Sequence, residues 1–132
     1  MFETTTVIRV HDTDAAGVVF FANYFRIAHT AYEKFMTSIG CGLDKIINRS
    51  DFLLPVVHAE ANYKKSLCLG EELTIFLEAD LRKSSFVMSY WFTDSQGVVT
   101  AELKTVHASI HQKTRKIIPL PEEIKKGLAT IT

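Results

Sequence analysis

The sequence predicts an α+β fold in which an antiparallel sheet of five strands curls around one long helix. The chain has 132 residues, 47% of them hydrophobic, which is enough for the core of a single domain spanning residues 1–132. One long segment has the apolar spacing of a helix, and the segments after it alternate apolar and polar residues between turns. Nothing requires a parallel crossover after the helix, so antiparallel packing is the simplest arrangement.

The N-terminal part predicts one strand and two helices. The segment Thr4–Val10 is rich in β-branched residues, which is typical of a strand. Apolar residues then recur at helical spacing over Tyr24–Ile39, which gives a helix of about four turns with one wide apolar face. Gly40 marks its end. The segment Leu43–Asn48 predicts a short second helix.

Strands joined mostly by hairpins follow. Pro55 lacks a backbone donor, which favours an edge position for the strand that begins near it. The residues Asp94–Gly97 predict a hairpin turn, and Pro121 opens a short terminal helix. The expected strands are Leu53–Lys65, Leu73–Leu81, Ser85–Thr93 and Val98–His111.

Composition excludes several classes of protein. Basic and acidic residues number 15 each, and a nucleic-acid groove usually needs a basic excess, so no nucleic-acid partner is expected. No apolar run reaches the roughly 18 residues of a membrane span, and the N-terminus lacks the features of a signal peptide, so we expect no membrane partner and a cytoplasmic location. Cys41 and Cys68 fit a reducing compartment and are too few for structural zinc, so no metal or cofactor is expected.

The strongest candidate for chemistry is an acidic turn of small residues just before the long helix. It reads Asp12-Thr13-Asp14-Ala15-Ala16-Gly17. A carboxylate beside a helix N-terminus can attack a substrate or activate water, while the helix end holds the developing negative charge. The residues alone favour a different role for Asp14, as an Asx-turn or capping residue. Asp12 is expected to hold the turn, and His11 to be a solvated strand end.

Four motifs occur in a characteristic order along almost the whole chain. They are Asp12–Tyr24, Leu54–Val57, Tyr63 with Gly70–Leu73, and Arg82–Phe86. In this order and at this length they resemble the 4-hydroxybenzoyl-CoA thioesterase family, which has the hotdog fold. The resemblance implies hydrolysis of an acyl-CoA thioester. It implies that Asp14 is the nucleophile or the general base, that the backbone N–H of Phe21 polarises the thioester carbonyl, and that Gly17 and Tyr24 bind substrate.

The resemblance also bears on the acyl group. The motif is most similar to the branch that hydrolyses 1,4-dihydroxy-2-naphthoyl-CoA in phylloquinone or menaquinone synthesis. Some bacterial members of the family carry a histidine at the position of Phe21, whereas a phenyl group cannot transfer a proton, so only the Phe21 backbone can contribute here. In the hydroxybenzoyl enzyme, the position of His29 carries an aspartate that meets the aryl hydroxyl. His29 would either bind a phenol or pair with Glu33 on the helix surface.

The resemblance also bears on how coenzyme A is recognised and on how the chains assemble. Arg82, Lys83 and Ser84 match the family's phosphate-contact region, with an ordinary solvated hairpin end as the alternative. The resemblance implies a homodimer, and a tetramer of such dimers, in which Asp14 of one chain and His29 of another face one substrate. Two other functions remain open: a thioesterase acting on short- or medium-chain aliphatic acyl-CoA, and a non-catalytic acyl-CoA binding module.

Overall fold

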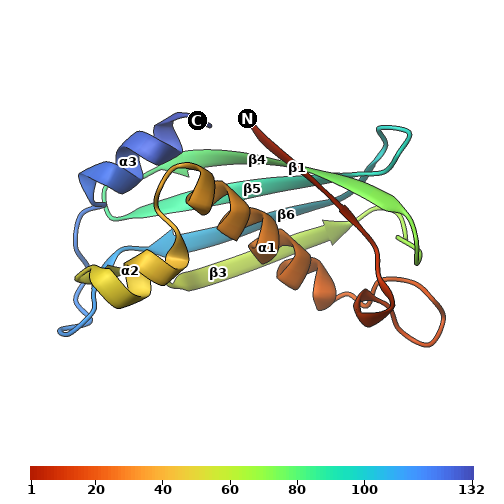
Figure 1. Cartoon of the computed structure of the whole chain (residues 1–132), viewed down its shortest axis with the longest axis horizontal. Coiled ribbons are helices and arrows are strands. Elements are labelled where there is room, and N and C mark those ends of the chain that lie inside the picture. Colours follow the sequence, from red (N-terminus) through yellow and green to blue (C-terminus); the bar gives the residue numbers. More distant parts are fainter.

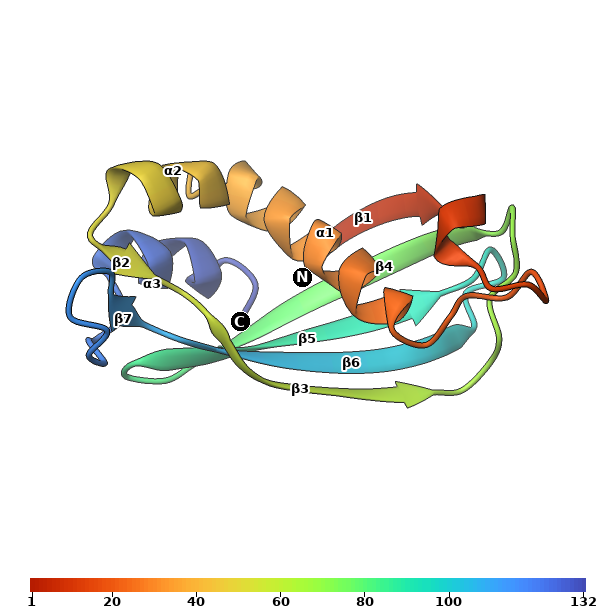
Figure 2. The same cartoon turned by 90° about the horizontal axis from the view of Figure 1, so that it is seen from below.

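A computed structural model describes the whole chain, residues 1–132, as one curved sheet with helices on one side. The strands of the main sheet are β1 (Phe2–Val7), β3 (Val56–Tyr63), β4 (Glu72–Leu81), β5 (Ser85–Thr93) and β6 (Val99–Ala108). The helices are η1 (Val10–Asp12, a 3-10 turn), α1 (Asn23–Ser38), α2 (Leu43–Arg49) and α3 (Glu122–Ala129). The five strands are antiparallel in the order β1-β4-β5-β6-β3, and α1 crosses the sheet diagonally (Figures 1 and 2). The predicted five-stranded α+β architecture is therefore confirmed.

The core lies between α1 and the inner face of the sheet. Leu77, Tyr90 and Leu103 stand side by side in register on β4, β5 and β6, and each is at most 1% exposed. The helix presents Tyr32 and Phe35 to this face, both also 1% exposed. Burial of each such side chain contributes about 1.5–3 kcal/mol. The alternation of the strands and the apolar stripe of the helix therefore favour the one packing that buries all of these side chains. None of the helices is both long and apolar enough to span a bilayer.

The structure corrects several predicted boundaries. The first strand ends at Val7, because the buried carboxylate of Asp12 accepts the Arg9 N–H at 2.8 Å and turns the chain into η1. The long strands predicted over 53–65 and 98–111 are each divided, near Pro55 and at Ser109. The detached pieces, β2 (Phe52–Leu53) and β7 (Ile110–His111), pair with each other in a separate two-stranded ladder.

The strand β3 is an edge of the sheet, as Pro55 predicted. Seven of its eight residues are exposed, although it pairs with β6 along its length. Ala59, Ala61 and Tyr63 stand in register with buried residues of β6 and so face the same side as α1, yet the helix leaves them mostly uncovered. A row of unpaired backbone groups and uncovered small side chains therefore runs along this edge.

Candidate active site

The loop between η1 and α1 forms a tight hairpin around Asp14. The Asp14 N–H donates to the Val18 carbonyl oxygen at 2.9 Å, and the Gly17 N–H donates to the Asp14 carbonyl oxygen at 3.1 Å. Gly17 has φ +78°, a conformation that glycine adopts at little cost. The Val19 N–H then donates to Leu67 at 2.8 Å. These bonds fasten the hairpin to the segment that leads into β4, close to the first turn of α1.

The Asp14 carboxylate is exposed and has one oxygen in use. Its Oδ1 accepts the Ala16 N–H at 2.8 Å, which makes the Asx-turn that the residues alone favoured. Its Oδ2 has no hydrogen-bond partner in the chain. The turn therefore orients the carboxylate and leaves one oxygen free to meet a substrate or a water molecule.

The N-terminus of α1 has unsatisfied donors. No side chain caps the helix, and its first turn contains no acidic residue. Phe21 lies two residues before α1, and neither Phe21 nor Ala22 donates its N–H to any acceptor in the chain. Free N–H groups at the positive end of a helix are suited to bind the oxygen of a polarised carbonyl.

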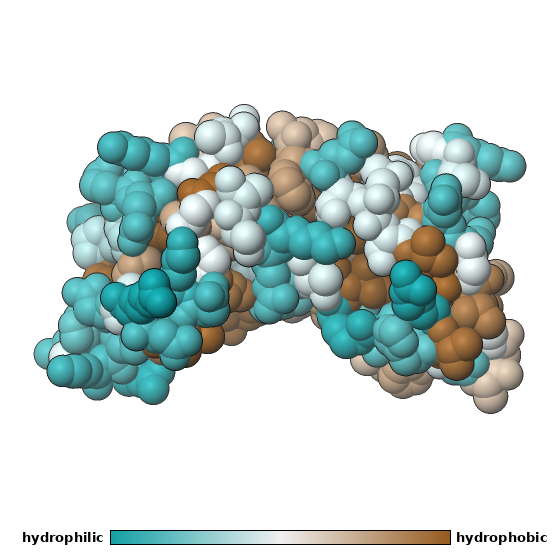
Figure 3. Space-filling view, in the orientation of Figure 1, coloured by the Kyte–Doolittle hydropathy of each residue, from teal (hydrophilic) through white to brown (hydrophobic).

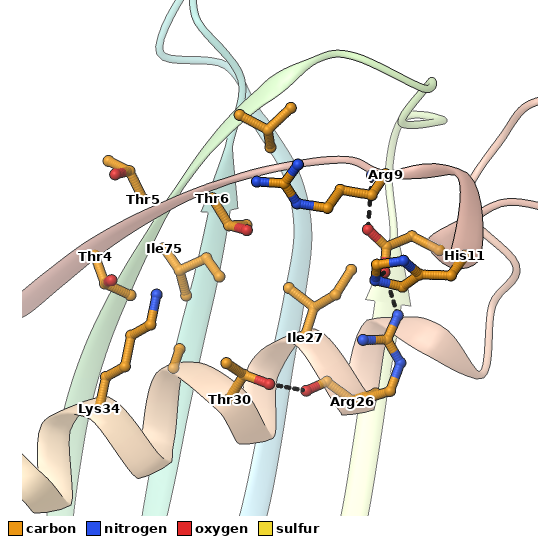
Figure 4. Close-up of a pocket in the computed structure, with 13 residues that line it drawn as sticks. Thr4, Thr5, Thr6, Arg9, His11, Arg26, Ile27, Thr30, Lys34 and Ile75 are labelled. Atoms are coloured by element: carbon orange, nitrogen blue, oxygen red, sulfur yellow. Dashed lines mark hydrogen bonds and ion pairs between the residues drawn. The ribbon is translucent and has the colours of Figure 1, made fainter.

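Asp12 fastens this loop to α1. Its side chain is buried, accepts the Arg9 N–H, and forms an ion pair with Arg26 of α1 (Figure 4). Its carbonyl oxygen accepts the Phe20 N–H at 3.2 Å and the Asn23 side-chain amide at 2.9 Å. Burial opposes ionisation, but the Arg9 N–H and the Arg26 guanidinium outweigh it and hold the pKa of Asp12 below its usual range. The expected structural role of Asp12 is what this geometry shows.

A pocket of about 340 Å³ opens beside Phe21, within the size range of ligand pockets. The rings of Tyr24 and Tyr63 meet edge to face in its wall, with centroids 4.7 Å apart. The Tyr63 hydroxyl donates to the Phe21 carbonyl oxygen at 3.1 Å. Figure 3 shows apolar surface gathered over the same loop, where Phe21 is 62% exposed. The pocket is lined by Val19, Phe21, Tyr24, Tyr63, Lys64, Lys65 and Ser66.

The two lysines of this pocket are already paired. Lys64 contacts Glu102 at 3.2 Å, and Lys65 contacts the buried carboxylate of Asp94 at 2.8 Å. The hydrogen bond between Lys65 and Asp94 raises the pKa of the lysine and lowers the pKa of the aspartate. Lys65 therefore holds the hairpin after β5, and Lys64 is bound to a carboxylate of β6.

Other predicted site residues lie elsewhere in the single chain. Arg82, Lys83 and Ser84 form the turn after β4, at the opposite end of the molecule from the Asp14 loop (Figure 1). The ten residues of β4 separate the two ends by about 30 Å. Arg82 contacts Asp80 at 3.0 Å. His29 lies on α1 and contacts Glu33 at 3.6 Å, which is the surface pair that the sequence left open.

Residues 8–128 match the thioesterase-like superfamily, and the chain belongs to that superfamily. A 1,4-dihydroxy-2-naphthoyl-CoA hydrolase from Synechococcus elongatus is 38% identical over 130 residues, which cover 96% of this chain and 94% of the relative. The crystal structure of a 1,4-dihydroxy-2-naphthoyl-CoA thioesterase from Synechocystis superposes with a TM-score of 0.92 at 29% identity, covering 97% and 95% of the two chains. A gentisyl-coenzyme A thioesterase structure has a TM-score of 0.84 at 26% identity, covering 94% and 99%.

These similarities confirm the predicted class. The hotdog fold, the thioester hydrolase class and the resemblance to the naphthoyl-CoA branch all agree with them. Asp14, Gly17, Phe21 and Tyr24 lie on the one loop that leads into α1, and of these Phe21 and Tyr24 line the pocket. Sequence reasoning assigned no role in the site to Tyr63, because it lies 42 residues from Phe21 and no local spacing connects the two. Its place in a family motif was the available signal.

Proposed function

We propose that this chain hydrolyses 1,4-dihydroxy-2-naphthoyl-CoA to the free aromatic acid and CoA, in phylloquinone or menaquinone synthesis. The observation that carries the proposal is one short loop that holds both a free carboxylate oxygen, Asp14 Oδ2, and the free N–H of Phe21, with an aromatic pocket opening beside Phe21. The names of the similar proteins support the same acyl group. Both cysteines are free thiols, which suits the reducing cytoplasm as the place of action.

In the proposed reaction, the Phe21 N–H donates to the thioester carbonyl oxygen and stabilises the negative charge that develops there. A donor of this kind is worth about 10²–10³ in kcat. Asp14 either attacks the carbonyl carbon, which gives a mixed anhydride that water then hydrolyses, or removes a proton from the attacking water. In both routes the C–S bond breaks and CoA leaves as the thiol. Since the Phe21 ring cannot transfer a proton, the acid–base work falls to Asp14.

The aromatic pocket is the proposed place for the acyl group. Phe21, Tyr24 and Tyr63 offer ring faces and edges to a fused aromatic acid. Aromatic pairs contribute about 0.5–1.5 kcal/mol beyond their burial, which favours an aryl group over an aliphatic chain of the same area. Gly17 lies in the same hairpin as Asp14, and, its chain neighbours aside, no other atom lies within 4 Å of the position that a Cβ would take there, so this side of the hairpin is open to substrate.

This proposal predicts a preference that a substrate panel measures. Free-thiol release should give a higher kcat/KM for naphthoyl-CoA and hydroxybenzoyl-CoA thioesters than for hexanoyl-CoA or acetyl-CoA. A preference for the aliphatic thioesters would assign the chain to the aliphatic alternative. Tight binding of acyl-CoA without thiol release would instead identify a binding module and defeat the enzymatic proposal.

We further propose that two chains pair along β3 to complete the site. The exposed edge carries Val56 and Val57, which are 44% and 61% exposed. Antiparallel pairing of two such edges about a two-fold axis would bring the distant end of one sheet, with Arg82 to Ser84, toward the Asp14 loop of the other chain. CoA phosphates would meet charge-assisted donors there, and His29 of the second chain would face the acyl group.

On the outer face of the sheet, Phe76 pairs with a half-buried Trp91, which suits the association of dimers into a tetramer.

Light scattering tests this assembly. The purified chain at micromolar concentration should have two or four times the 14.9 kDa mass of one chain. Val57→Lys should shift the equilibrium toward monomer, because it places a charge in the proposed interface. Val98→Lys is the matched control, since Val98 is 46% exposed in the hairpin after β5. A wild-type mass of one chain would contradict the dimer.

A further inference from the structure

A polar groove runs between β1 and α1, on the edge of the sheet opposite β3. Thr4 and Thr6 stand in register with Ile75 and Leu73, two buried residues of β4, so their side chains face α1. Apolar side chains are the usual choice at such positions. Here α1 presents Lys34 to them, and Figure 4 shows its side chain extending from the helix toward Thr4 and Thr6. We call this space the β1–α1 groove.

The groove contains unpaired cations. Its volume is about 200 Å³, and both Arg9 and Lys34 line it. Neither side chain forms an ion pair within the chain, whereas Arg26 is engaged by the buried carboxylate of Asp12. Figure 4 shows the Arg9 side chain turning back along β1 toward the threonines. An adjoining hollow of about 400 Å³ shares both free cations and also includes Glu72, which forms no ion pair.

The hydroxyl groups of the groove are available as donors. Thr4 and Thr6 are half-buried, and their side chains make no hydrogen bond within the chain. The one carboxylate in the groove, that of Asp12, is already compensated by Arg26 and by the Arg9 N–H. Two cations without an ion-pair partner and two hydroxyl groups without a hydrogen-bond partner thus line the same groove.

We propose that the β1–α1 groove binds a phosphate group. A tetrahedral dianion accepts charge-assisted hydrogen bonds from a guanidinium and an ammonium, and its remaining oxygens accept from hydroxyls. Free phosphate and the phosphate ester of a nucleotide offer the same chemistry. The groove also touches Asp12, which fastens the Asp14 loop to α1, so an anion there would sit next to the support of the proposed active site. This inference does not depend on the identity of the acyl group or on catalysis by Asp14.

Titration with inorganic phosphate, followed by calorimetry at constant ionic strength, tests the groove. The double variant Arg9→Gln/Lys34→Gln should weaken phosphate binding at least about 10-fold, since it removes two charge-assisted hydrogen bonds whose strength is partly screened by salt. The Arg9 side chain can be replaced without touching the bond from its backbone to Asp12. The control Lys104→Gln/Lys126→Gln removes the same charge from exposed positions and should bind as the wild type does.

A second variant and a second ligand sharpen the test. Thr4→Val/Thr6→Val keeps shape and charge and should also weaken phosphate binding, by loss of the hydroxyl donors. If a nucleotide is the source of the phosphate, CoA should bind more tightly than 3′-dephospho-CoA, and this difference should shrink in Arg9→Gln/Lys34→Gln. If the difference between CoA and its dephospho form is the same in the wild type and in Arg9→Gln/Lys34→Gln, while inorganic phosphate responds to the groove variants, free phosphate is the ligand. Equal phosphate binding by the wild type and both groove variants, or no phosphate binding at millimolar concentration, would overturn the proposal.

Discussion

Replacing Asp14 with asparagine is expected to lower kcat for the preferred acyl-CoA by at least about 100-fold, the smallest factor usual for loss of general-base catalysis. An amide is neither a nucleophile of useful strength nor a base, so both proposed routes are blocked. The fold should survive, because an asparagine side-chain oxygen can still accept the Ala16 N–H that the carboxylate accepts at 2.8 Å. Initial rates of thiol release measure the loss, and thermal unfolding checks the fold.

A matched control is available on the same molecule. Asp51→Asn makes the same chemical change at an exposed residue between α2 and β2 that forms no ion pair. It should leave both kcat and the unfolding temperature at wild-type values. Turnover by Asp14→Asn within a few-fold of the wild type would remove Asp14 from the chemistry and leave it as a turn residue.

A second large effect is expected from the buried imidazole of His107. The ring is 1% exposed and stacks on Phe86 with centroids 4.7 Å apart. Its Nδ1 lies 3.2 Å from the Leu54 carbonyl oxygen, and its Nε2 lies 2.9 Å from the Thr105 hydroxyl. A neutral ring that donates from Nδ1 and accepts at Nε2 satisfies both partners. Burial, together with the nearby His29, lowers the pKa of His107 to about 4, although the bond to Leu54 opposes the shift.

This shift makes the stability of the fold fall in mild acid. In the unfolded chain a histidine has a pKa near 6.5. Between that pH and about pH 4, His107 is therefore protonated in the unfolded state but mostly neutral in the folded state. His107 should therefore lower the free energy of unfolding by about 2–3 kcal/mol between pH 7.5 and pH 4.5. Above about pH 7.5 it should make no pH-dependent contribution.

Urea unfolding at several pH values, compared between the wild type and His107→Gln, isolates this contribution. The amide of glutamine is uncharged over the whole range, so the difference between the two proteins should shrink as the pH falls. NMR titration of the imidazole in the wild type gives the same answer should the variant fold poorly. A pKa near 6.5 for His107, or parallel stability curves, would show that the buried ring carries no such penalty.

Local patterns were enough to predict most of the fold. The alternation of β4 and β5 and the apolar stripe of α1 appear in the sequence because each element buries a single face. The split of the predicted strands at Pro55 and Ser109 was not predicted, since it depends on β2 pairing with β7 far along the chain. Pairing between distant segments leaves no periodic signal in either one.

The residues of the candidate site likewise fall into those that the sequence could predict and those that it could not. Asp14, Gly17, Phe21 and Tyr24 could be proposed from the sequence because they lie on one continuous segment. The contact of Tyr63 with Phe21 and the β1–α1 groove could not, because each joins separate strands to the region of α1. The predicted CoA contacts of the turn after β4 lie at the other end of the chain, and only the proposed second chain brings them to the loop.

The central claim is that Asp14 and the Phe21 N–H act on the same thioester. Its most direct test is a crystal structure of Asp14→Asn with intact 1,4-dihydroxy-2-naphthoyl-CoA, the variant being used because it should bind substrate without cleaving it. The account predicts the thioester carbonyl oxygen about 3 Å from the Phe21 nitrogen. It also predicts either the side chain of residue 14, or a water molecule hydrogen-bonded to that side chain, about 3–3.5 Å from the carbonyl carbon. A thioester bound away from the N-terminus of α1, or one turned so that neither residue 14 nor a water molecule bound to it can reach the carbonyl carbon, would contradict it.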